Sequence, residues 1–426
     1  MKTLKQTVDR ILKEIRLFLT APVKDNQEKT VKHTEHLKKT PEFAVGSSTR
    51  LTRQVCDFLQ THYDFRYNLL TEETEFRPED NRDVAFTPVG KRDLNTFCME
   101  AHQDGISCWD KDLSRYVYST RIAEYHPFRL YMDELPDWDG VDRLCALARR
   151  VSDDAVWIKS FHTWMLALTA QWMGMTDLHA NSVAPLLISS EQGRQKSTFC
   201  KSLMPQVLAR YYTDNLRLSA QGNSERLLSE MGLINMDEFE KYPANKMPLL
   251  KNLMQMSSLN ICKAYQRNFR NLPRIASFIG TSNHCDLLSD PTGSRRFICI
   301  EVEHNIDCTG IDHSQIYAQL KAELLQGRRH WFTKEEEREL QRHNAAYYRI
   351  CPAEEVFRAC YRAASAEEDC EQLSAAHIYK VLKGYNSAAM RGSNPATFGQ
   401  VLLAAGVVRK HTKIGNVYMV KALKAV

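Results

Sequence analysis

Apolar residues recur along the chain at two spacings, one typical of helices and one typical of strands. Helical spacing predicts an N-terminal amphipathic helix whose apolar face consists of Val8, Ile11, Leu12, Ile15, Phe18 and Leu19. The same spacing predicts further helices over residues 51–63, 93–103, 144–151, 156–175, 224–231 and 244–257. Short apolar runs predict strands over residues 65–70, 74–77, 184–189, 232–236, 275–280 and 298–302. Because helices separate the strands at 184–189, 232–236 and 275–280, we expect an α/β fold with a parallel sheet.

The length of 426 residues is sufficient for two or three domains. A polar stretch over residues 25–40 reads as a linker after the N-terminal helix, and residues 125–128 begin a second linker-like passage. We expect five parts: a helix and flexible linker, a small α+β domain, an α/β core preceded by a helical subdomain, a helical connector or lid, and a compact C-terminal domain. Their ranges are 1–50, 51–124, 125–305, 306–350 and 351–426.

Composition narrows the class of protein. An apolar content of 43% and a charged content of 26% are typical of a soluble globular protein. The net charge of +5 excludes a uniformly basic coat for nucleic acid, so a nucleic-acid surface must be local. No segment approaches the ~18–20 apolar residues that span a bilayer. The scattered cysteines favour reduced thiols, so we expect a cytoplasmic protein. The twelve cysteines form no C-x-x-C pair, which argues against a disulfide framework or a zinc site, including one at His284 and Cys285.

One stretch, residues 185–199, has the layout of a phosphate-binding loop. An apolar run turns through polar residues and opens a helix at Lys196, which would reach the outer phosphates, while Ser197 would ligate Mg²⁺. Ser190 and Gln195 occupy the two usual glycine positions, where left-handed angles are costly for most residues. The alternative is an ordinary strand–turn–helix connection with a solvated lysine. The expected nucleotide-binding residues are Gln192, Gly193, Arg194, Gln195, Lys196, Ser197 and Thr198.

Two carboxylates end the apolar run that follows. In a parallel sheet the carboxyl end of this strand lies beside the phosphate loop, so Asp237 can hold Mg²⁺ and Glu238 can orient or deprotonate the attacking water. The alternative is a strand that merely ends in solvated acids. The next strand ends at Asn283, which can reach the γ-phosphate or the attacking water. Arg295 and Arg296 follow at a turn, where a planar guanidinium suits charge on a phosphoryl group.

Residues 259–274 contain four cations and no acid: Lys263, Arg267, Arg270 and Arg274. Their alternation predicts a basic hairpin. Such a cluster is commonly a solvated face, but beside an ATPase core it also suits a strand of nucleic acid. Phe65, Arg66 and Tyr67 could similarly stack on bases, although in a strand they are more often part of the core, and we favour the core.

These motifs, in this order, resemble the virulence-associated protein E family, itself similar to the superfamily 3 helicases within the AAA+ group of P-loop NTPases. The matching segments lie within residues 125–305 and are 135–144, 192–193 with 196–198, 237–238, Tyr265 with Arg267, 280–283 and 292–297. The resemblance implies Mg²⁺- and ATP-dependent work on single-stranded or forked DNA during replication of a phage or mobile element. It also implies a homo-oligomer, for which a hexameric ring is one arrangement. Arg295 or Arg296 would then act on the neighbour's nucleotide, while Lys263, Arg267 and Arg270 would grip DNA.

The C-terminal part predicts three helices, over residues 356–364, 374–385 and 394–405, followed by a hairpin that turns at Gly415 and Asn416. Three helices and a basic hairpin are the plan of a winged helix, with Arg409, Lys410 and Lys413 placed to contact phosphate. Many winged helices bind protein instead, so both uses stay open.

The function that these features favour is an oligomeric, helicase-like ATPase. Two alternatives remain. The first is a nucleotide-gated DNA-binding or initiator protein that hydrolyses ATP weakly or not at all, because its phosphate loop lacks the glycines. The second is a non-catalytic interaction protein on a decayed fold. No primase domain is evident in residues 1–120, which show no clear acidic metal-binding pattern.

Overall fold

The computed structural model of the chain describes residues 47–175, 179–218, 223–261, 270–288, 294–348, 350–364, 368–412 and 415–423. The predicted helix at residues 8–19 and the predicted linker at residues 25–40 lie outside these ranges. The chain divides into two compact units, Met1–Gln54 and Val55–Val426, and the first contributes only the start of one helix to the described residues. Within the described ranges, no helix combines the length and the apolar character needed to cross a bilayer.

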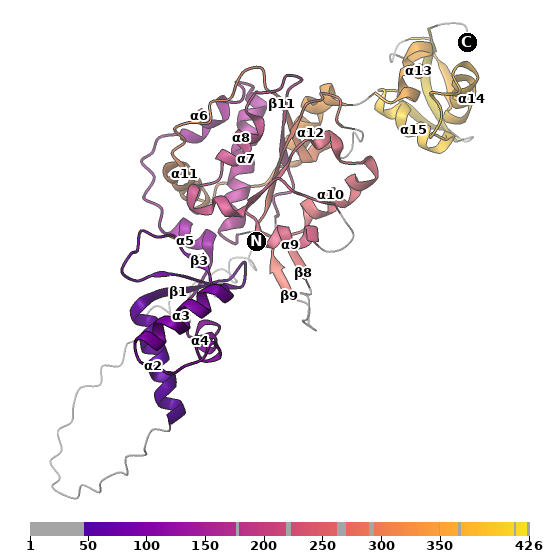
Figure 1. Cartoon of the computed structure of the whole chain (residues 1–426). Coiled ribbons are helices and arrows are strands. Elements are labelled where there is room, and N and C mark those ends of the chain that lie inside the picture. The colour runs from indigo at the N-terminus through magenta and orange to yellow at the C-terminus, as the bar shows by residue number, and fades with distance from the viewer. Residues whose placement is uncertain are drawn as a thin grey trace, which may run out of the picture. The chain divides into compact units, whose positions relative to one another are not determined.

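A small α+β domain comes first in the described chain (Figure 1). Its sheet has the strand order β3-β2-β1-β4, in which β1 and β2 are antiparallel and β4 is parallel to β1. The predicted strand pair is therefore confirmed. The elements are α2 (Ser47–His62), β1 (Tyr63–Asn68), β2 (Glu73–Pro78), β3 (Thr87–Pro88), α3 (Lys91–Gln103), α4 (Asp110–Val117) and β4 (Glu124–Tyr125).

The aromatic residues of β1 belong to the core of this domain, as we favoured. The Phe65 ring lies 6.0 Å from the Phe97 ring at an angle of 84°, an edge-to-face arrangement. The guanidinium of Arg66 is also engaged, since it pairs with the fully buried Glu75 at 2.9 Å and lies 3.8 Å above the Phe86 ring. These contacts leave little of the segment for stacking on bases.

Three helices follow: α5 (Pro127–Asp133), α6 (Arg143–Arg149) and α7 (Ala155–Trp172). The interpretation of residues 125–128 as the start of a linker was wrong. Pro127 occupies the first turn of α5, where its missing N–H costs nothing, and His126 caps the helix by accepting from Arg129 N. Phe128 is fully buried and its ring lies 4.7 Å from that of Trp172, so α5 is part of the core.

The central element is a five-stranded sheet of order β11-β5-β10-β7-β6, in which every neighbouring pair is parallel. The predicted α/β class with a parallel sheet is thus confirmed. The elements of this region are β5 (Ala184–Ile188), α8 (Lys196–Ser202), η1 (Gln206–Tyr211), β6 (Tyr212–Thr213), α9 (Asn223–Glu230), β7 (Leu233–Met236), η2 (Phe239–Lys241), η3 (Ala244–Lys246), α10 (Met247–Gln255), β10 (Ser277–Ser282), η4 (Ser294–Arg296) and β11 (Phe297–Glu301).

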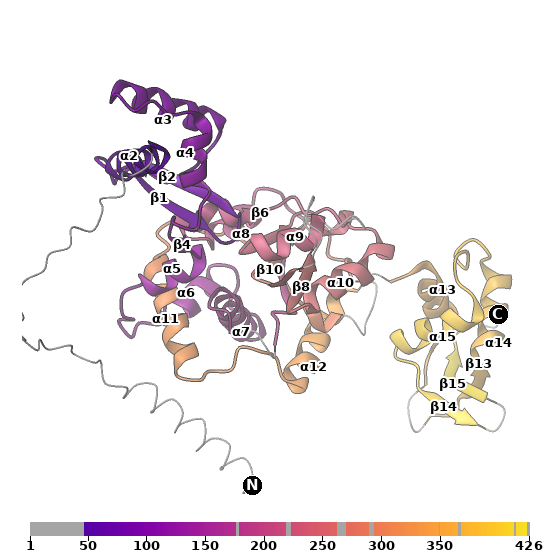
Figure 2. The same ribbon diagram turned by 90° about the horizontal axis from the view of Figure 1, so that it is seen from below.

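Both faces of this sheet are buried, which explains the continuous apolar runs of its strands. Leu187 of β5 packs into one hydrophobic cluster, which includes α7 and α8. Its neighbours Leu186 and Ile188 pack into a second cluster, which includes α9 and α10. Figures 1 and 2 show helices on both sides of the sheet. Gly280 of β10 is needed for this packing, because a Cβ there would lie 2.7 Å from Leu186 Cδ2 and 3.1 Å from Met236 O.

The predicted basic hairpin is present as β8 (Ser258–Ile261) and β9 (Arg270–Pro273), which are antiparallel and pair Ile261 with Arg270. Its tip, with Lys263 and Arg267, lies outside the described residues. Arg274 requires a correction, since it is only 1% exposed and is not part of a charged face. Its guanidinium donates to five main-chain carbonyl oxygens, those of Ala276, Leu253, Met254, Met256 and Asn181.

Two helices after the sheet, α11 (His313–Leu325) and α12 (Lys334–His343), are followed by η5 (Asn344–Tyr347). Ile316, Leu320 and Leu324 of α11 and Leu340 of α12 join the same cluster as α7. The acidic segment at residues 135–144 is held against α11. Asp142 caps α6 and accepts from Gln319 Nε2, and Asp139 pairs with Arg143, which lowers the pKa of the Asp139 carboxyl to about 2.

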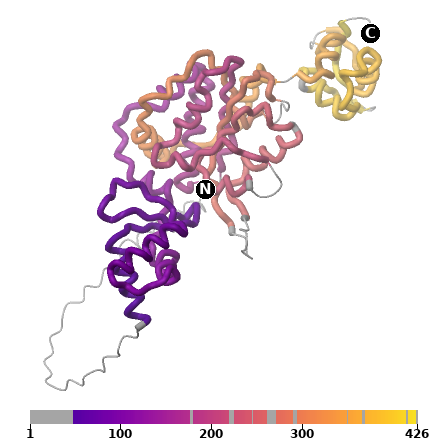
Figure 3. Tube along the Cα trace, in the orientation of Figure 1, coloured from indigo at the N-terminus to yellow at the C-terminus, as the bar shows by residue number. Residues whose placement is uncertain are grey.

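The C-terminal domain has its own hydrophobic cluster. Strand β15 pairs antiparallel with β12, β13 and β14. Helix α15 begins at Asn394, whose side chain accepts from two main-chain N–H groups, and Gly406 follows it with φ +84°. The elements, shown in yellow at the end of the tube in Figure 3, are α13 (Pro352–Cys360), β12 (Tyr361–Ala363), β13 (Glu371–Ser374), α14 (Ala375–Tyr385), α15 (Pro395–Ala404), β14 (Arg409–Thr412) and β15 (Gly415–Ala422).

Candidate functional site

The carboxyl ends of three neighbouring strands, β5, β10 and β7, meet at one edge of the parallel sheet. A pocket of about 410 Å³ lies at this edge. It is lined by Gln192, Gly193, Arg194, Gln195, Lys196, Ser197, Thr198, Asp237, Glu238, Thr281 and Asn283. All seven predicted loop residues therefore face one pocket with the predicted Asp237, Glu238 and Asn283.

The loop from Ser189 to Gln195 reverses the chain between β5 and α8. Two residues adopt left-handed backbone angles, Gly193 with φ +83° and Gln195 with φ +63°. The second of these is unusual, because a left-handed conformation costs a residue with a Cβ roughly 1–2 kcal/mol. Gln195 nevertheless starts α8, and its carbonyl accepts from Phe199 N at 2.8 Å. The costly backbone angles that we expected at position 195 are thus present.

Lys196 is a buried cation of the pocket and is only 8% exposed. Its Nζ donates to Ser189 O at 3.2 Å and to Asn283 Oδ1 at 3.1 Å. Burial lowers the pKa of the lysine, and the charges of Glu240 and Asp237 oppose this shift. The amine is therefore held between two oxygen acceptors, and most of the lysine side chain is buried.

Asp237 is the common acceptor of two hydroxyl groups, one from α8 and one from β10. Ser197 Oγ donates to Asp237 Oδ1 at 2.7 Å, and Thr281 Oγ1 donates to the same oxygen at 2.5 Å. Hydroxyl and carboxylate oxygens are the donors that Mg²⁺ prefers. The predicted ligand pair, Ser197 and Asp237, thus lies in contact, and these two side chains could hold Mg²⁺.

Glu238 follows Asp237 with a left-handed φ of +51°, which turns the chain sharply after β7. Its main-chain N–H donates to Thr281 Oγ1 at 3.3 Å, and its carboxylate pairs with Lys241. Thr281 was not predicted as a site residue. A polar residue near the carboxyl end of an apolar strand was the sequence signal that could have identified it. Glu240 was not predicted either, and its Oε1 accepts from Asn283 N at 3.4 Å and so helps to fix the end of β10.

The profile of the virulence-associated protein E-like domain matches residues 132–349, a little more than half of the chain. The chain belongs to this family. The profile of a domain of unknown function described from B. Theta matches residues 350–420. A comparison with curated proteins found no match.

Two apo structures of the C-terminal region of NrS-1, residues 305–718, are similar to this member of the virulence-associated protein E-like family. One has 14% identity and a TM-score of 0.38 and covers 70% of this chain and 67% of that one. The other has 10% identity and a TM-score of 0.42 and covers 87% of this chain and 99% of that one. These values describe a distant likeness, from which we draw no conclusion.

Neither Arg295 nor Arg296 lines the pocket. Arg295 Nη1 pairs with Glu337 Oε2 of α12 at 3.0 Å, and Arg296 follows it in η4. Lys263, Arg267 and Lys413 lie outside the described residues, and Arg270 is described only as the start of β9. Arg409 and Lys410 are exposed on β14, so their charges are accessible to solvent.

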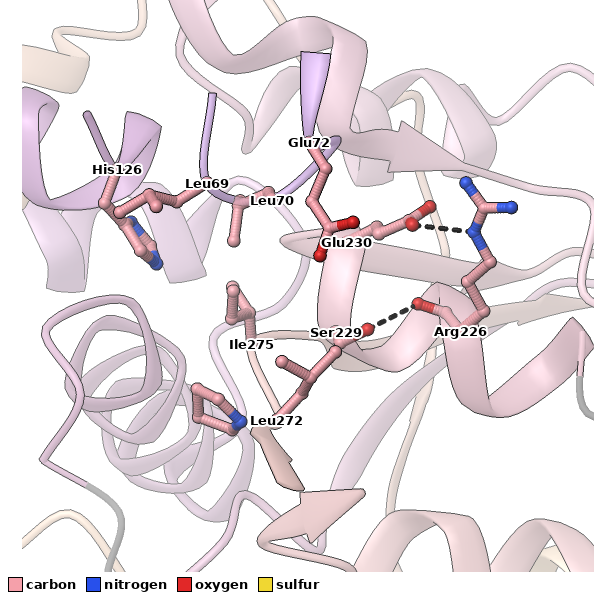
Figure 4. Close-up of a pocket in the computed structure, with 10 residues that line it drawn as sticks. Leu69, Leu70, Glu72, His126, Arg226, Ser229, Glu230, Leu272 and Ile275 are labelled. Carbon is pink, nitrogen blue, oxygen red and sulfur yellow. Dashed lines mark hydrogen bonds and ion pairs between the residues drawn. The ribbon is translucent and has the colours of Figure 1, made fainter. Parts of the chain in front are cut away.

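A second, smaller pocket of about 150 Å³ lies where the turn after β1 meets α9 and β9 (Figure 4). Leu69, Leu70, Leu272 and Ile275 give it an apolar wall. Its cation, Arg226, already pairs with Glu230 at 2.7 Å. This pocket therefore lacks the convergent cation and hydroxyl groups that distinguish the first.

Proposed function

We propose that the chain is a P-loop ATPase that binds ATP in the pocket at residues 192–198 and hydrolyses it with Mg²⁺. The single observation that carries this proposal is the convergence of Lys196, Ser197, Asp237 and Glu238 on one 410 Å³ pocket. A cation, a hydroxyl–carboxylate pair and a second carboxylate are the groups that phosphoryl transfer from a nucleotide requires. An ordinary strand–turn–helix connection does not need these four groups in one place.

Five residues of the pocket have roles that follow from their positions. Lys196 would exchange its two oxygen acceptors for phosphate oxygens of the nucleotide and neutralise their charge. Ser197 and Asp237 would hold Mg²⁺, which neutralises charge on the phosphates. Glu238 would orient or deprotonate the attacking water, because it lines the pocket while its neighbour Glu240 is turned toward Asn283 N. Asn283 would contact the γ-phosphate or the attacking water.

We further propose that the ATPase acts on DNA as a helicase-like motor in the replication of a phage or mobile element, as the family resemblance implies. In this proposal the C-terminal domain is a winged helix. Its element order of α13, β12, β13, α14, α15, β14 and β15 supports this, as does the exposure of Arg409 and Lys410 on the hairpin. Helix α15 contains no Lys or Arg, so the hairpin would supply the phosphate contacts.

A weakly hydrolysing, nucleotide-gated DNA-binding protein is the second candidate. The observation in its favour is Gln195, whose side chain and left-handed backbone replace the glycine that such a loop usually has. Both candidates require ATP binding, and only the first requires rapid turnover that DNA stimulates.

Calorimetric titration of the full chain with Mg·ATP tests the shared step. Lys196→Ala should abolish measurable binding, because it removes the buried cation of the pocket. Lys201→Ala is the matched control, since Lys201 is an exposed lysine of the same helix outside the pocket, and it should bind like the parent. Equal affinity of the Lys196→Ala variant and the parent would reject the site.

A further inference from the structure

Two cysteines and a histidine converge at the end of α3, in the small α+β domain and outside the ATP pocket. Cys98, His102 and Cys108 each offer one ligand atom, and these atoms all lie within 4.8 Å of one another. A zinc site was not expected from the sequence, because the cysteines form no C-x-x-C pair. The spacing here is C-x₃-H-x₅-C, in which a helical turn replaces the short loop of a C-x-x-C pair.

Helix geometry and a turn bring the three residues together. Cys98 and His102 are four residues apart on α3, so their side chains lie on one face. The helix ends in a Schellman motif, in which Ile106 N donates to Ala101 O at 2.9 Å and Gly105 N donates to His102 O at 3.0 Å. Gly105 supplies the required left-handed φ of +78°. This turn folds the chain back, so that the buried Cys108 lies against the last turns of the helix.

The side chains of Cys98 and His102 already point to one spot. Cys98 Sγ lies 3.5 Å and His102 Nε2 lies 2.7 Å from the same oxygen, Cys108 O. The distance between Cys98 Sγ and His102 Nε2 is 3.9 Å. Tetrahedral zinc, with Zn–S about 2.3 Å and Zn–N about 2.0–2.1 Å, separates sulfur and nitrogen ligands by about 3.6 Å. To bind the ion, Cys98 and His102 would exchange their contacts with Cys108 O for the metal, and the three ligand atoms, now within 4.8 Å of one another, would move closer together.

We infer that Cys98, His102 and Cys108 form a site for Zn²⁺, with two thiolates and one imidazole as ligands. An open pocket of about 320 Å³, lined in part by His102 and Cys108, leaves room for a water molecule as the fourth ligand. The ion cross-links the end of α3 to the segment that leads into α4. Its role is independent of the ATPase proposal, because none of the three ligands lines the ATP pocket.

The test is the zinc content of the full chain, purified under a reducing agent and measured by mass spectrometry of the metal. The parent should retain one zinc ion per chain, and Cys98→Ser, His102→Ala and Cys108→Ser should each lose it. Cys285→Ser is the matched control, because Cys285 is an exposed cysteine beside a histidine, and it should retain the ion.

Cobalt substitution gives a second readout. It responds to metal ligation by the cysteines and would not respond if these residues had only a structural role. Co²⁺ bound to the parent should show the thiolate charge-transfer absorption, and Cys98→Ser should weaken it. If the buried Cys108→Ser variant fails to fold, Cys98→Ser and the exposed His102→Ala still decide the question. A parent that binds no more zinc than these variants would overturn the inference.

Discussion

Lys196 Nζ donates a hydrogen bond to Asn283 Oδ1 across 3.1 Å. The bond joins the start of α8 to the end of β10, two elements separated by 87 positions in the sequence. It places the cation of the loop and the polar end of the neighbouring strand on the same side of the pocket. If the pocket binds ATP as proposed, a phosphate group on Lys196 would lie close to the Asn283 side chain.

Gln195 gives the first prediction. Gln195→Gly should bind Mg·ATP at least as tightly as the parent, because glycine accepts φ +63° without the cost of roughly 1–2 kcal/mol. Gln195→Val should lose affinity, since a β-branched residue is a severe outlier at this angle. Calorimetric titration of both variants measures the difference. A clear loss of affinity in Gln195→Gly would show instead that the glutamine side chain makes a contact of its own with the nucleotide.

Arg274 gives a prediction about stability. Arg274→Leu should lower the free energy of unfolding by about 3 kcal/mol or more, because carbonyl oxygens buried around the guanidinium lose their donors. Arg338→Leu, at an exposed position of α12, is the control and should change stability by less than about 0.5 kcal/mol. Urea unfolding of both variants provides the comparison. Equal stability of the two would refute the structural role of Arg274.

Arg274 also shows why the sequence predicted the hairpin but not which of its cations are exposed and which are buried. Alternation along residues 259–274 is a local property, and it correctly predicted two antiparallel strands. Whether a cation at the end of a strand points to solvent or into the core depends on the partners that tertiary packing brings to it. Here the partners are carbonyls from the end of α10 and from Asn181, which are distant in the sequence.

The candidate site was easier to predict than the small elements around it. Parallel strands must present their carboxyl ends at one edge, so the pattern of strands and helices was sufficient to place the residues after β5, β7 and β10 together. Thr281 was missed because the role of its hydroxyl depends on the hydrogen bond to Asp237, which is distant in the sequence. Helix α5 was missed because it is short and its capping residue, His126, is an uncommon one.

Arg295 gives a prediction that distinguishes a catalytic role of its guanidinium from a structural role in the ion pair with Glu337. If Arg295 acts on a neighbouring subunit's nucleotide, Arg295→Ala should reduce ATP turnover by ~10³-fold or more. Glu337→Gln removes only the ion-pair partner of Arg295 and should leave turnover within about twofold of the parent, since a partly exposed pair is worth about 1 kcal/mol or less. Steady-state ATPase assays measure both variants. Equal losses in the two would assign Arg295 a structural role.

A mixing experiment extends this test to the assembly. An Arg295→Ala/Arg296→Ala subunit combined with a Lys196→Ala subunit should recover part of the ATPase activity, because each supplies the half of a shared site that the other lacks. Co-assembly of the two variants is verified by differential tagging. Mixtures that assemble but recover no activity at any ratio would remove the support for a site shared between subunits.

The most direct test of the central claim is the rate of ATP hydrolysis by the full chain, measured with Mg²⁺ and with or without single-stranded or forked DNA. We predict that DNA stimulates turnover. Lys196→Ala should abolish both turnover and ATP binding, whereas Glu238→Gln should abolish turnover and retain ATP binding. Parental turnover in the Glu238→Gln variant would show that the water is activated by another group. An ATP-binding parent with no turnover in either the presence or the absence of DNA would contradict the ATPase account.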